Sequence, residues 1–376
     1  MKIVFKKSDL TNAVNIVSKA IVTRTTMSIL ECIFIEAGDK IKFIANDMEL
    51  GIETIVKGEI LERGQIAIDA KMLSDIVRKL PDEDITIETD ENFVVNITCG
   101  KINFKINGKE GYDFIFLPKF EREESIYFSQ FTLKEIIKQT IFSILNKEDG
   151  SIAKTMSGEL FEIKGNILKV VSLDGHRISI RKVELKESFK DISVIVPGKS
   201  LNEINKILNG GNEDMVRVFF TKNVNSDSNV YSHIVFEFDN TVVVSRLIEG
   251  NYFNIDKMIS SDYDVKFKVN KKELYDCIDR ATLFSSDKDN QPIVTSITDD
   301  NVEITINSSM GYMDENVRID KTGKDLVIGF NPKFIMDALK VIDDEEVSFY
   351  MLNAKSPCFI KNDEESYIYI ILPVNL

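Results

Sequence analysis

The sequence predicts an α+β fold in which one module occurs three times, each copy having two helices packed on antiparallel sheets. The first observation is a short apolar strand that runs directly into an amphipathic helix, a unit found in each third of the chain. The apolar residues of each helix follow the i, i+3, i+4, i+7 spacing of one buried stripe. A lysine starts each unit's helix, at Lys71, Lys199 and Lys333, and these positions differ by 128 and 134 residues. Such domain-sized intervals indicate repeat architecture.

Two further elements recur in the same order and support the triplication. A strand end leads into another amphipathic helix, with an apolar residue five positions before the leading leucine, at Phe5, Phe128 and Val269. After that helix comes a strand that ends in a polar turn, at 41–47, 168–174 and 302–307. Intervening runs such as 84–89 alternate apolar and polar residues, as one-faced antiparallel strands do. Charged stretches near 119–124 and 258–264 place the modules at 1–122, 123–258 and 259–376.

Length and composition fit several globular domains with substantial cores, since 43% of the 376 residues are hydrophobic and 29% charged. The chain has no apolar run of ~18 residues and starts without a secretion signal, so we expect a cytoplasmic protein. The four cysteines are scattered without a C-x-x-C pair, which predicts buried free thiols. His176 and His233 lie far apart, so we expect neither a metal site nor a cofactor.

The charges are unevenly distributed between the helices and the rest of the chain. Net charge is −14, which argues against a protein that grips DNA over its whole surface. The six expected helices nevertheless carry +7, so the remainder carries −21. One interpretation is that lysine is simply a good helix former on a solvated face. The other is that equivalent basic helices line a hole, which suits a protein that encircles a polyanion without gripping it.

Several short motifs, in this order and spacing, resemble those of the bacterial DNA sliding clamp, the beta subunit of the replicative DNA polymerase III. The resemblance covers the whole chain. Its most specific pieces are 24–30 (Arg-Thr-Thr-Met-Ser-Ile-Leu), 172–177 (Ser-Leu-Asp-Gly-His-Arg), 194–197 with Lys199, 328–331, Ser356-Pro357 and 372–376 (Leu-Pro-Val-Asn-Leu).

The resemblance implies a ring that forms as a head-to-tail homodimer around double-stranded DNA, independent of sequence. Such a ring is non-catalytic. It is a processivity factor that tethers the replicative polymerase and also binds the clamp loader and repair proteins through short peptide motifs. The loader uses ATP and the ring has no ATP site, which agrees with the lack of a G-x-x-x-x-G-K-[ST] phosphate loop here.

The resemblance also implies where these partners bind. The partner-peptide pocket would comprise Met156, Leu173, Gly175, His176, Arg177, Ile178, Phe253, Lys257, Met258, Pro357, Ile370, Leu372, Pro373, Val374, Asn375 and Leu376. Contacts to DNA carried over from the family are Arg24, Lys71, Arg78, Lys147 and Lys199. The charge pattern alone adds Lys134, Lys138, Lys206 and Lys272. The dimer interface would comprise Phe104 and Ile106 of one subunit against Leu283 and Phe284 of the other, with Phe284 the most telling.

The sequence departs from the family at Ser28, Leu173, Phe253 and Asn375, where Pro, Thr, Pro and Arg are usual. Three of these positions are in the pocket, so a clamp-like scaffold with altered partners and no loading on DNA is an alternative. A hydrolase using Asp174 and His176 is a second alternative. It would need a nucleophile elbow or a placed cysteine, and the sequence has neither.

Overall fold

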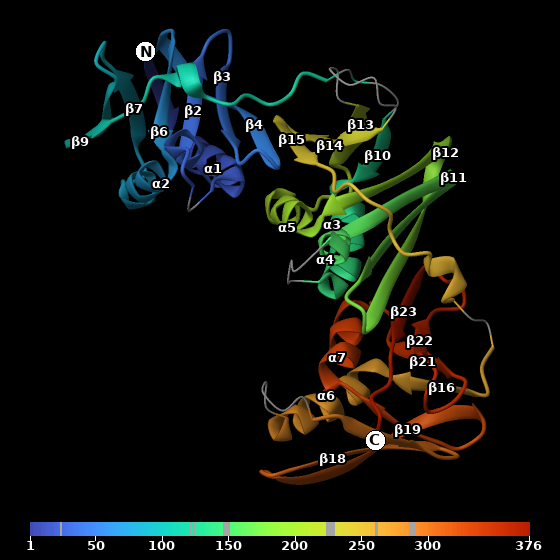
Figure 1. The fold of residues 1–376 in the computed structure, drawn as a ribbon. Helices are drawn as coiled ribbons and strands as arrows, with labels where there is room; N and C mark the ends of the chain where they lie inside the picture. Colours follow the sequence, from blue (N-terminus) through green and yellow to red (C-terminus); the bar gives the residue numbers. More distant parts are fainter. Residues whose placement is uncertain are drawn as a thin grey trace. The chain divides into compact units, whose positions relative to one another are not determined.

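The computed structural model describes residues 1–22, 25–120, 122, 125–145, 151–222, 230–259, 262–285 and 291–376. The chain divides into two compact units. Figure 1 shows its helices and strands. The first unit comprises Met1–Lys134 and Asn202–Leu247, and the second Glu135–Leu201 and Ile248–Leu376. This division passes through the central third of the chain, so the module boundaries after residues 122 and 258 stay a prediction.

The first unit contains two antiparallel sheets, in the orders β5-β1-β7-β8-β9 and β10-β13-β14-β15-β4-β3-β2-β6. Helices α1 (Lys7–Val17) and α2 (Ala70–Lys79) contact each other, and their buried side chains are apolar. The larger sheet is continuous because β15 pairs with β4, from Thr241 opposite Thr54 to Ser245 opposite Leu50. The strands are β1 (Lys2–Lys6), β2 (Cys32–Ala37), β3 (Ile41–Asn46), β4 (Leu50–Val56), β5 (Glu59–Glu62), β6 (Gly64–Asp69), β7 (Asp84–Thr89), β8 (Val94–Cys99), β9 (Ile102–Asn107), β10 (Ile126–Ser129), β13 (Met215–Lys222), β14 (Tyr231–Phe238) and β15 (Thr241–Arg246).

The second unit is organised around one ten-stranded array, in the order β11-β12-β23-β22-β21-β16-β19-β18-β17-β20. Its strands are β11 (Gly158–Leu173), β12 (Arg177–Pro197), β16 (Val265–Asn270), β17 (Ile293–Ile297), β18 (Asn301–Ser308), β19 (Gly311–Gly323), β20 (Leu326–Phe330), β21 (Glu346–Met351), β22 (Cys358–Lys361) and β23 (Tyr367–Ile371). Its helices are α4 (Ser151–Met156), α6 (Lys271–Ala281) and α7 (Pro332–Val341), whereas α3 (Gln130–Thr140) and α5 (Gly198–Ile207) span the division between the units. The order β20-β17-β18-β19 matches β6-β2-β3-β4 of the first unit, so the predicted α+β repeat is confirmed.

Strand β11 turns back on itself near its middle. The Tyr252 hydroxyl lies 3.4 Å from the Gly158 carbonyl oxygen and 3.3 Å from that of Val171. Thirteen residues of straight strand would separate those oxygens by roughly 43 Å. Gly165, with a φ of +60°, provides the left-handed residue that the reversal needs. The two halves of β11 are therefore neighbours, which places Glu162 beside Lys169.

A lysine caps the second helix in each of the three copies. Lys7 donates to the Leu80 carbonyl oxygen, Lys134 to that of Leu208 at 3.0 Å, and Lys271 to that of Ile342 at 2.5 Å. Each acceptor lies at a helix C-terminus, where carbonyls lack helical partners and the dipole favours a cation. Lys134 was expected at DNA, but its ammonium is used for this cap.

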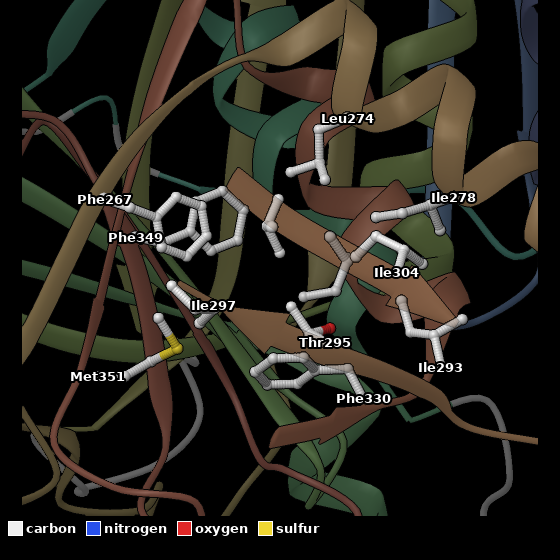
Figure 2. A pocket seen from close by; sticks show the side chains of 12 residues that line it. Phe267, Leu274, Ile278, Ile293, Thr295, Ile297, Ile304, Phe330, Phe349 and Met351 are labelled. Atoms are coloured by element: carbon white, nitrogen blue, oxygen red, sulfur yellow. The ribbon is translucent and has the colours of Figure 1, made fainter. Parts of the chain in front are cut away.

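The core of the last third lies between helices α6 and α7 and the surrounding strands. Figure 2 shows the side chains that line a small cavity within it, including Phe267, Leu274, Phe330 and Phe349. The cavity measures about 20 Å³ and its lining is almost entirely apolar. A water needs several polar partners, so the cavity is a packing gap and no ligand site. The four cysteines are buried free thiols, as the sequence predicts.

Candidate functional site

The centre of the predicted pocket is a cluster of apolar side chains from β11, β12 and β23. This floor cluster consists of Leu160, Val171, Leu173, Ile180, Ile255, Tyr350, Phe359, Ile368 and Ile370, with Met156, Ile178, Tyr252 and Ile259 packed against it. Cross-strand register brings the members together, because Ile178 pairs with Leu173 and with Ile370. Four of the predicted pocket residues, Met156, Leu173, Ile178 and Ile370, are therefore in one contiguous apolar region.

The turn from Asp174 to Arg177 is fixed by its own side chains. Asp174 Oδ1 accepts hydrogen bonds from the backbone amides of His176 and Arg177, at 3.0 and 3.1 Å. Gly175 has a φ of +90°, which a residue with a side chain rarely adopts. Asp174 Oδ2 accepts from Arg177 Nε at 2.9 Å. Both carboxylate oxygens are thus used within the turn, so Asp174 is poorly placed to serve His176 as a hydrolytic base.

Arg177 is buried, with only 8% of its surface exposed. Its Nη1 donates to Asp337 Oδ2 of helix α7 at 2.6 Å, and its Nη2 donates to the Phe142 carbonyl oxygen at 2.7 Å. The guanidinium carbon also lies 4.6 Å from the centre of the Phe334 ring. Arg177 therefore joins the turn to α7, and its donors are occupied inside the protein. The ring of His176, on an exposed residue, stacks on Phe334 at 6.1 Å.

The rim segment, residues 252–258, contains three residues of the predicted pocket. Phe253, Lys257 and Met258 are exposed there, whereas Ile255 is buried in the floor cluster. The short helical turn Ile255–Lys257 is closed by a hydrogen bond from the Met258 amide to the Ile255 carbonyl oxygen, at 2.8 Å. The Tyr252 hydroxyl, which donates to β11, holds the start of the segment.

The C-terminal tail, residues 372–376, and Pro357 make up the remaining part of the predicted pocket. The Leu372 amide donates to the His176 carbonyl oxygen at 2.9 Å, and the Val374 amide donates to that of Gly329 at 2.9 Å. Val374 and Gly329 also form an antiparallel bridge. Leu372, Val374, Asn375 and Leu376 are exposed, whereas Pro357 and Pro373 are half-buried. All described pocket candidates lie in the second unit, and the tail extends along β20.

The predicted DNA contacts are spread over the helices. Lys71, Arg78, Lys138, Lys199, Lys206 and Lys272 are exposed, and Lys134 is half-buried. Arg24 and Lys147 lie outside the described residues. Four of the exposed cations pair with an acid of their own helix, at 2.5 to 3.3 Å, namely Arg78 with Asp75, Lys138 with Glu135, Lys206 with Glu203 and Lys272 with Asp276. Such exposed pairs are weak, so these cations stay available to other anions. The neighbouring acids nevertheless reduce the positive charge of each helix face.

The predicted interface residues differ in exposure from what the sequence suggests. Leu283 is 74% exposed, whereas Phe284 is partly buried and packs against the core of the last third. Gly311 makes room for that ring, because a Cβ there would lie 2.8 Å from Phe284 Cε1. Phe104 and Ile106 are half-buried on β9, the edge strand of its sheet. Leu283, rather than Phe284, is the more exposed apolar group.

Two features of the site could not be recognised from sequence. Lys169 links Glu162 to Asp256 in the rim segment, and Asp337 receives Arg177. In the part of the chain that the structure describes, no cluster of His, Cys, Asp or Glu has the makings of a metal site. Nor does any helix there have the length and apolarity needed to cross a membrane.

Comparison with known proteins identifies the family. Models of the DNA polymerase III beta subunit match along the chain: the N-terminal domain at residues 1–118, the central domain at 128–254 and the C-terminal domain at 256–375. The beta sliding clamp of Staphylococcus epidermidis is 33% identical over 386 residues, covering 100% of this chain and 99% of that protein.

Solved structures agree with this assignment. A putative DNA polymerase III beta subunit from Eubacterium rectale is 58% identical with a TM-score of 0.94, and covers 100% of both chains. The sliding clamp of Bacillus subtilis is 30% identical with a TM-score of 0.93, covering 100% of this chain and 99% of that one. The chain therefore belongs to the DNA polymerase III beta subunit family of DNA sliding clamps, which are non-catalytic processivity factors.

Proposed function

We propose that this clamp encircles duplex DNA as a head-to-tail dimeric ring and holds the replicative polymerase, the clamp loader and repair proteins through short peptide motifs. The observation that carries the peptide part is the apolar floor cluster, together with the exposed apolar side chains Phe253 and Met258 in the rim segment and Leu372, Val374 and Leu376 in the tail. Apolar pockets with a few fixed polar groups are the usual form of a peptide or ligand site.

The peptide that fits this pocket carries apolar anchors. The half-buried Ile178 and Met156 and the exposed Met258 offer apolar contacts, and the two methionines are flexible thioethers that accept varied shapes. Leu173 and Ile370 are buried members of the same cluster. Backbone groups of the turn and the tail supply the polar contacts. The role of Arg177 is to hold the 174–177 turn in place, since its guanidinium donors are already engaged inside the protein.

The DNA part of the proposal rests on the exposed helix cations, without Lys134. Each would contact phosphate, and phosphate contacts carry no sequence information directly. Because several cations are paired within their own helix, the attraction to the duplex is weak and sensitive to salt. Weak, unspecific attraction permits sliding.

The ring part of the proposal rests on two groups of apolar side chains, of which Leu283 is exposed and Phe104, Ile106 and Phe284 are half-buried. One is the β9 edge strand with Phe104 and Ile106, and the other is Leu283 with Phe284 beside it. Different surfaces on one chain make a head-to-tail contact, which gives a closed ring when the rotation closes. We expect Leu283→Asp to yield monomers in sedimentation velocity, because the dimer would have to bury a charged carboxylate in place of the exposed leucine. An unchanged dimer would remove this interface.

Retention on circular DNA tests the function as a whole. The clamp is loaded by its loader onto a nicked circle, separated from free protein, and the circle is then cut once. A sliding ring is expected to leave the linear DNA and stay on the uncut control. Retention after cutting would indicate ordinary affinity for DNA. Absence of loading, with peptide binding intact, would favour the scaffold alternative.

A further inference from the structure

Lys169 and Asp256 form an ionic tie that reaches the rim segment from the strand beneath it. Lys169 Nζ donates to Asp256 Oδ1 at 2.8 Å, and the same ammonium lies 2.6 Å from Glu162 Oε2. Lys169 is 14% exposed on β11, whereas Asp256 is largely exposed within the short helical turn Ile255–Lys257. Neither residue belongs to the predicted pocket.

The tie is well defined because both partners favour the charged form. The hydrogen bond from Lys169 holds the pKa of Asp256 below its usual range. Burial alone would lower the pKa of Lys169, but its hydrogen bonds to Asp256 and Glu162 raise it. Glu162 already restrains the Lys169 side chain. Forming the pair with Asp256 therefore costs less side-chain conformational entropy than an ion pair between two freely moving exposed side chains.

The ionic tie between Lys169 and Asp256 affects how the rim segment presents Lys257 and Met258. Asp256 lies between Ile255, which is anchored in the floor cluster, and Lys257 and Met258, which face outward. A backbone hydrogen bond from the Met258 amide to the Ile255 carbonyl oxygen closes the turn. Fixing the Asp256 carboxylate therefore fixes the direction in which Lys257 and Met258 project. Preorganisation of this kind raises affinity by lowering the ordering cost of binding.

We propose that Lys169 is a positioning residue for the partner-peptide pocket, which acts through Asp256 to hold the rim segment in its binding conformation. It touches no peptide itself. This inference rests on the proposed peptide function of the pocket, and it adds a specific residue pair that sets how well the rim is ordered.

The test is a fluorescence titration of a labelled peptide carrying the polymerase's own clamp-binding segment, against full-length clamp. Lys169→Met is expected to weaken binding about fivefold, the size of one ordered ion pair. Lys169→Arg, which keeps the charge and the reach, should restore most of the affinity. Asp256→Asn should match Lys169→Met, and the double variant should be no worse than either single one.

The matched control is Lys164→Met. Lys164 pairs with Glu162 at 3.0 Å in the same cluster, and it acts on Asp256 only as a nearby charge, with a smaller effect on the Asp256 pKa than Lys169 has. Affinity should therefore stay close to the wild-type value. A readout independent of affinity is hydrogen exchange at the Met258 amide, which should become faster in Lys169→Met with global stability unchanged.

The outcomes separate the two proposals. If the wild-type clamp does not bind the peptide, the proposed function of the pocket fails. If the wild type binds and Lys169→Met binds equally well with unchanged exchange at Met258, the positioning inference is wrong. Additive losses in the double variant would likewise contradict it, because they would show that the two residues act separately.

Discussion

The floor of the proposed partner-peptide pocket consists of buried apolar residues, whereas its proposed rim consists of exposed side chains held by a few polar contacts. Leu173 and Ile370 are packed on every side, but Phe253 and Met258 are exposed. Two acids show the same contrast. Glu159, beside the floor, is fully buried, and burial raises its pKa to about 8. On the rim, the hydrogen bond from Lys169 lowers the pKa of Asp256.

This difference separates the buried residues, which tolerate few substitutions, from the exposed residues, which tolerate more. Buried apolar packing tolerates little change in volume, so the floor is the constant part of the pocket. Ionic ties and exposed side chains can be altered at small cost to the fold. Phe253 on the rim and Leu173 in the floor both differ from the residues usual in the family. The packing argument predicts that partner preference changes at less cost to the fold through Phe253 than through Leu173.

The largest effect is expected from breaking the ion pairs of Arg177 with Asp174 and Asp337. Arg177→Met leaves the carboxylates of Asp174 and Asp337 without their cation in a largely buried place. Removing one partner of a buried ion pair costs about 3–5 kcal/mol. Urea unfolding should show this loss, and Arg78→Met, on an exposed helix face, should show almost none. Equal midpoints for the two variants would contradict the buried role of Arg177.

Because Glu159 is buried next to the floor cluster, we expect the free energy of unfolding to fall as pH rises. Glu159 is neutral in the folded protein up to about pH 8, since burial raises its pKa from 4.5. Its neighbour Thr140 ends helix α3 and donates its hydroxyl to the Ile136 carbonyl oxygen, at 2.7 Å. That hydroxyl is then free to accept a hydrogen bond from a protonated carboxyl, and a helix C-terminus disfavours a negative charge.

The sign follows from linkage. The stabilising contribution of the neutral form is complete below pH 4.5, where the unfolded chain is also protonated, and it is lost between 4.5 and about 8. Between pH 5 and 8 the loss is about 3 kcal/mol. Glu159→Gln should flatten this part of the wild-type curve of unfolding free energy against pH. A variant as pH-dependent as wild type would show that Glu159 is ionised when folded.

A smaller effect is expected where the tail crosses strand β20. A Cβ at Gly329 would lie 2.6 Å from Leu376 Cδ2 and 2.9 Å from the Val374 carbonyl oxygen. Gly329→Val should therefore displace the tail and weaken peptide binding about tenfold, with little change in unfolding free energy. Val327→Ala, on the exposed face of the same strand, is the control. Unaltered affinity in Gly329→Val would mean that the tail position does not matter.

The sequence predicts the repeat and the floor better than the contacts that orient them. Helix and strand periodicity is local, so the triplicated modules and the apolar positions of Leu173 and Ile370 could be recognised. The motif around Arg177 suggests a place at the pocket, but its partner Asp337 is 160 residues away and only the fold brings the two side chains together. Lys134 illustrates the same limit, because an exposed lysine and a helix-capping lysine have the same helical spacing.

The rim and the interface show why single positions are harder to assign. Lys169 is a single charge within the apolar run 167–171, and nothing local indicates two acidic partners. Leu283 and Phe284 are adjacent, and which one is exposed depends on the space that Gly311 leaves. Side-chain burial at the end of a helix is a tertiary property that the spacing of apolar residues does not determine.

The most direct test of the account is peptide binding by a clamp that lacks residues 373–376. A fluorescence titration with the polymerase's clamp-binding peptide should show loss of measurable affinity, while sedimentation velocity shows the same dimer as wild type. Peptide affinity equal to that of the intact chain would contradict the assignment of the pocket.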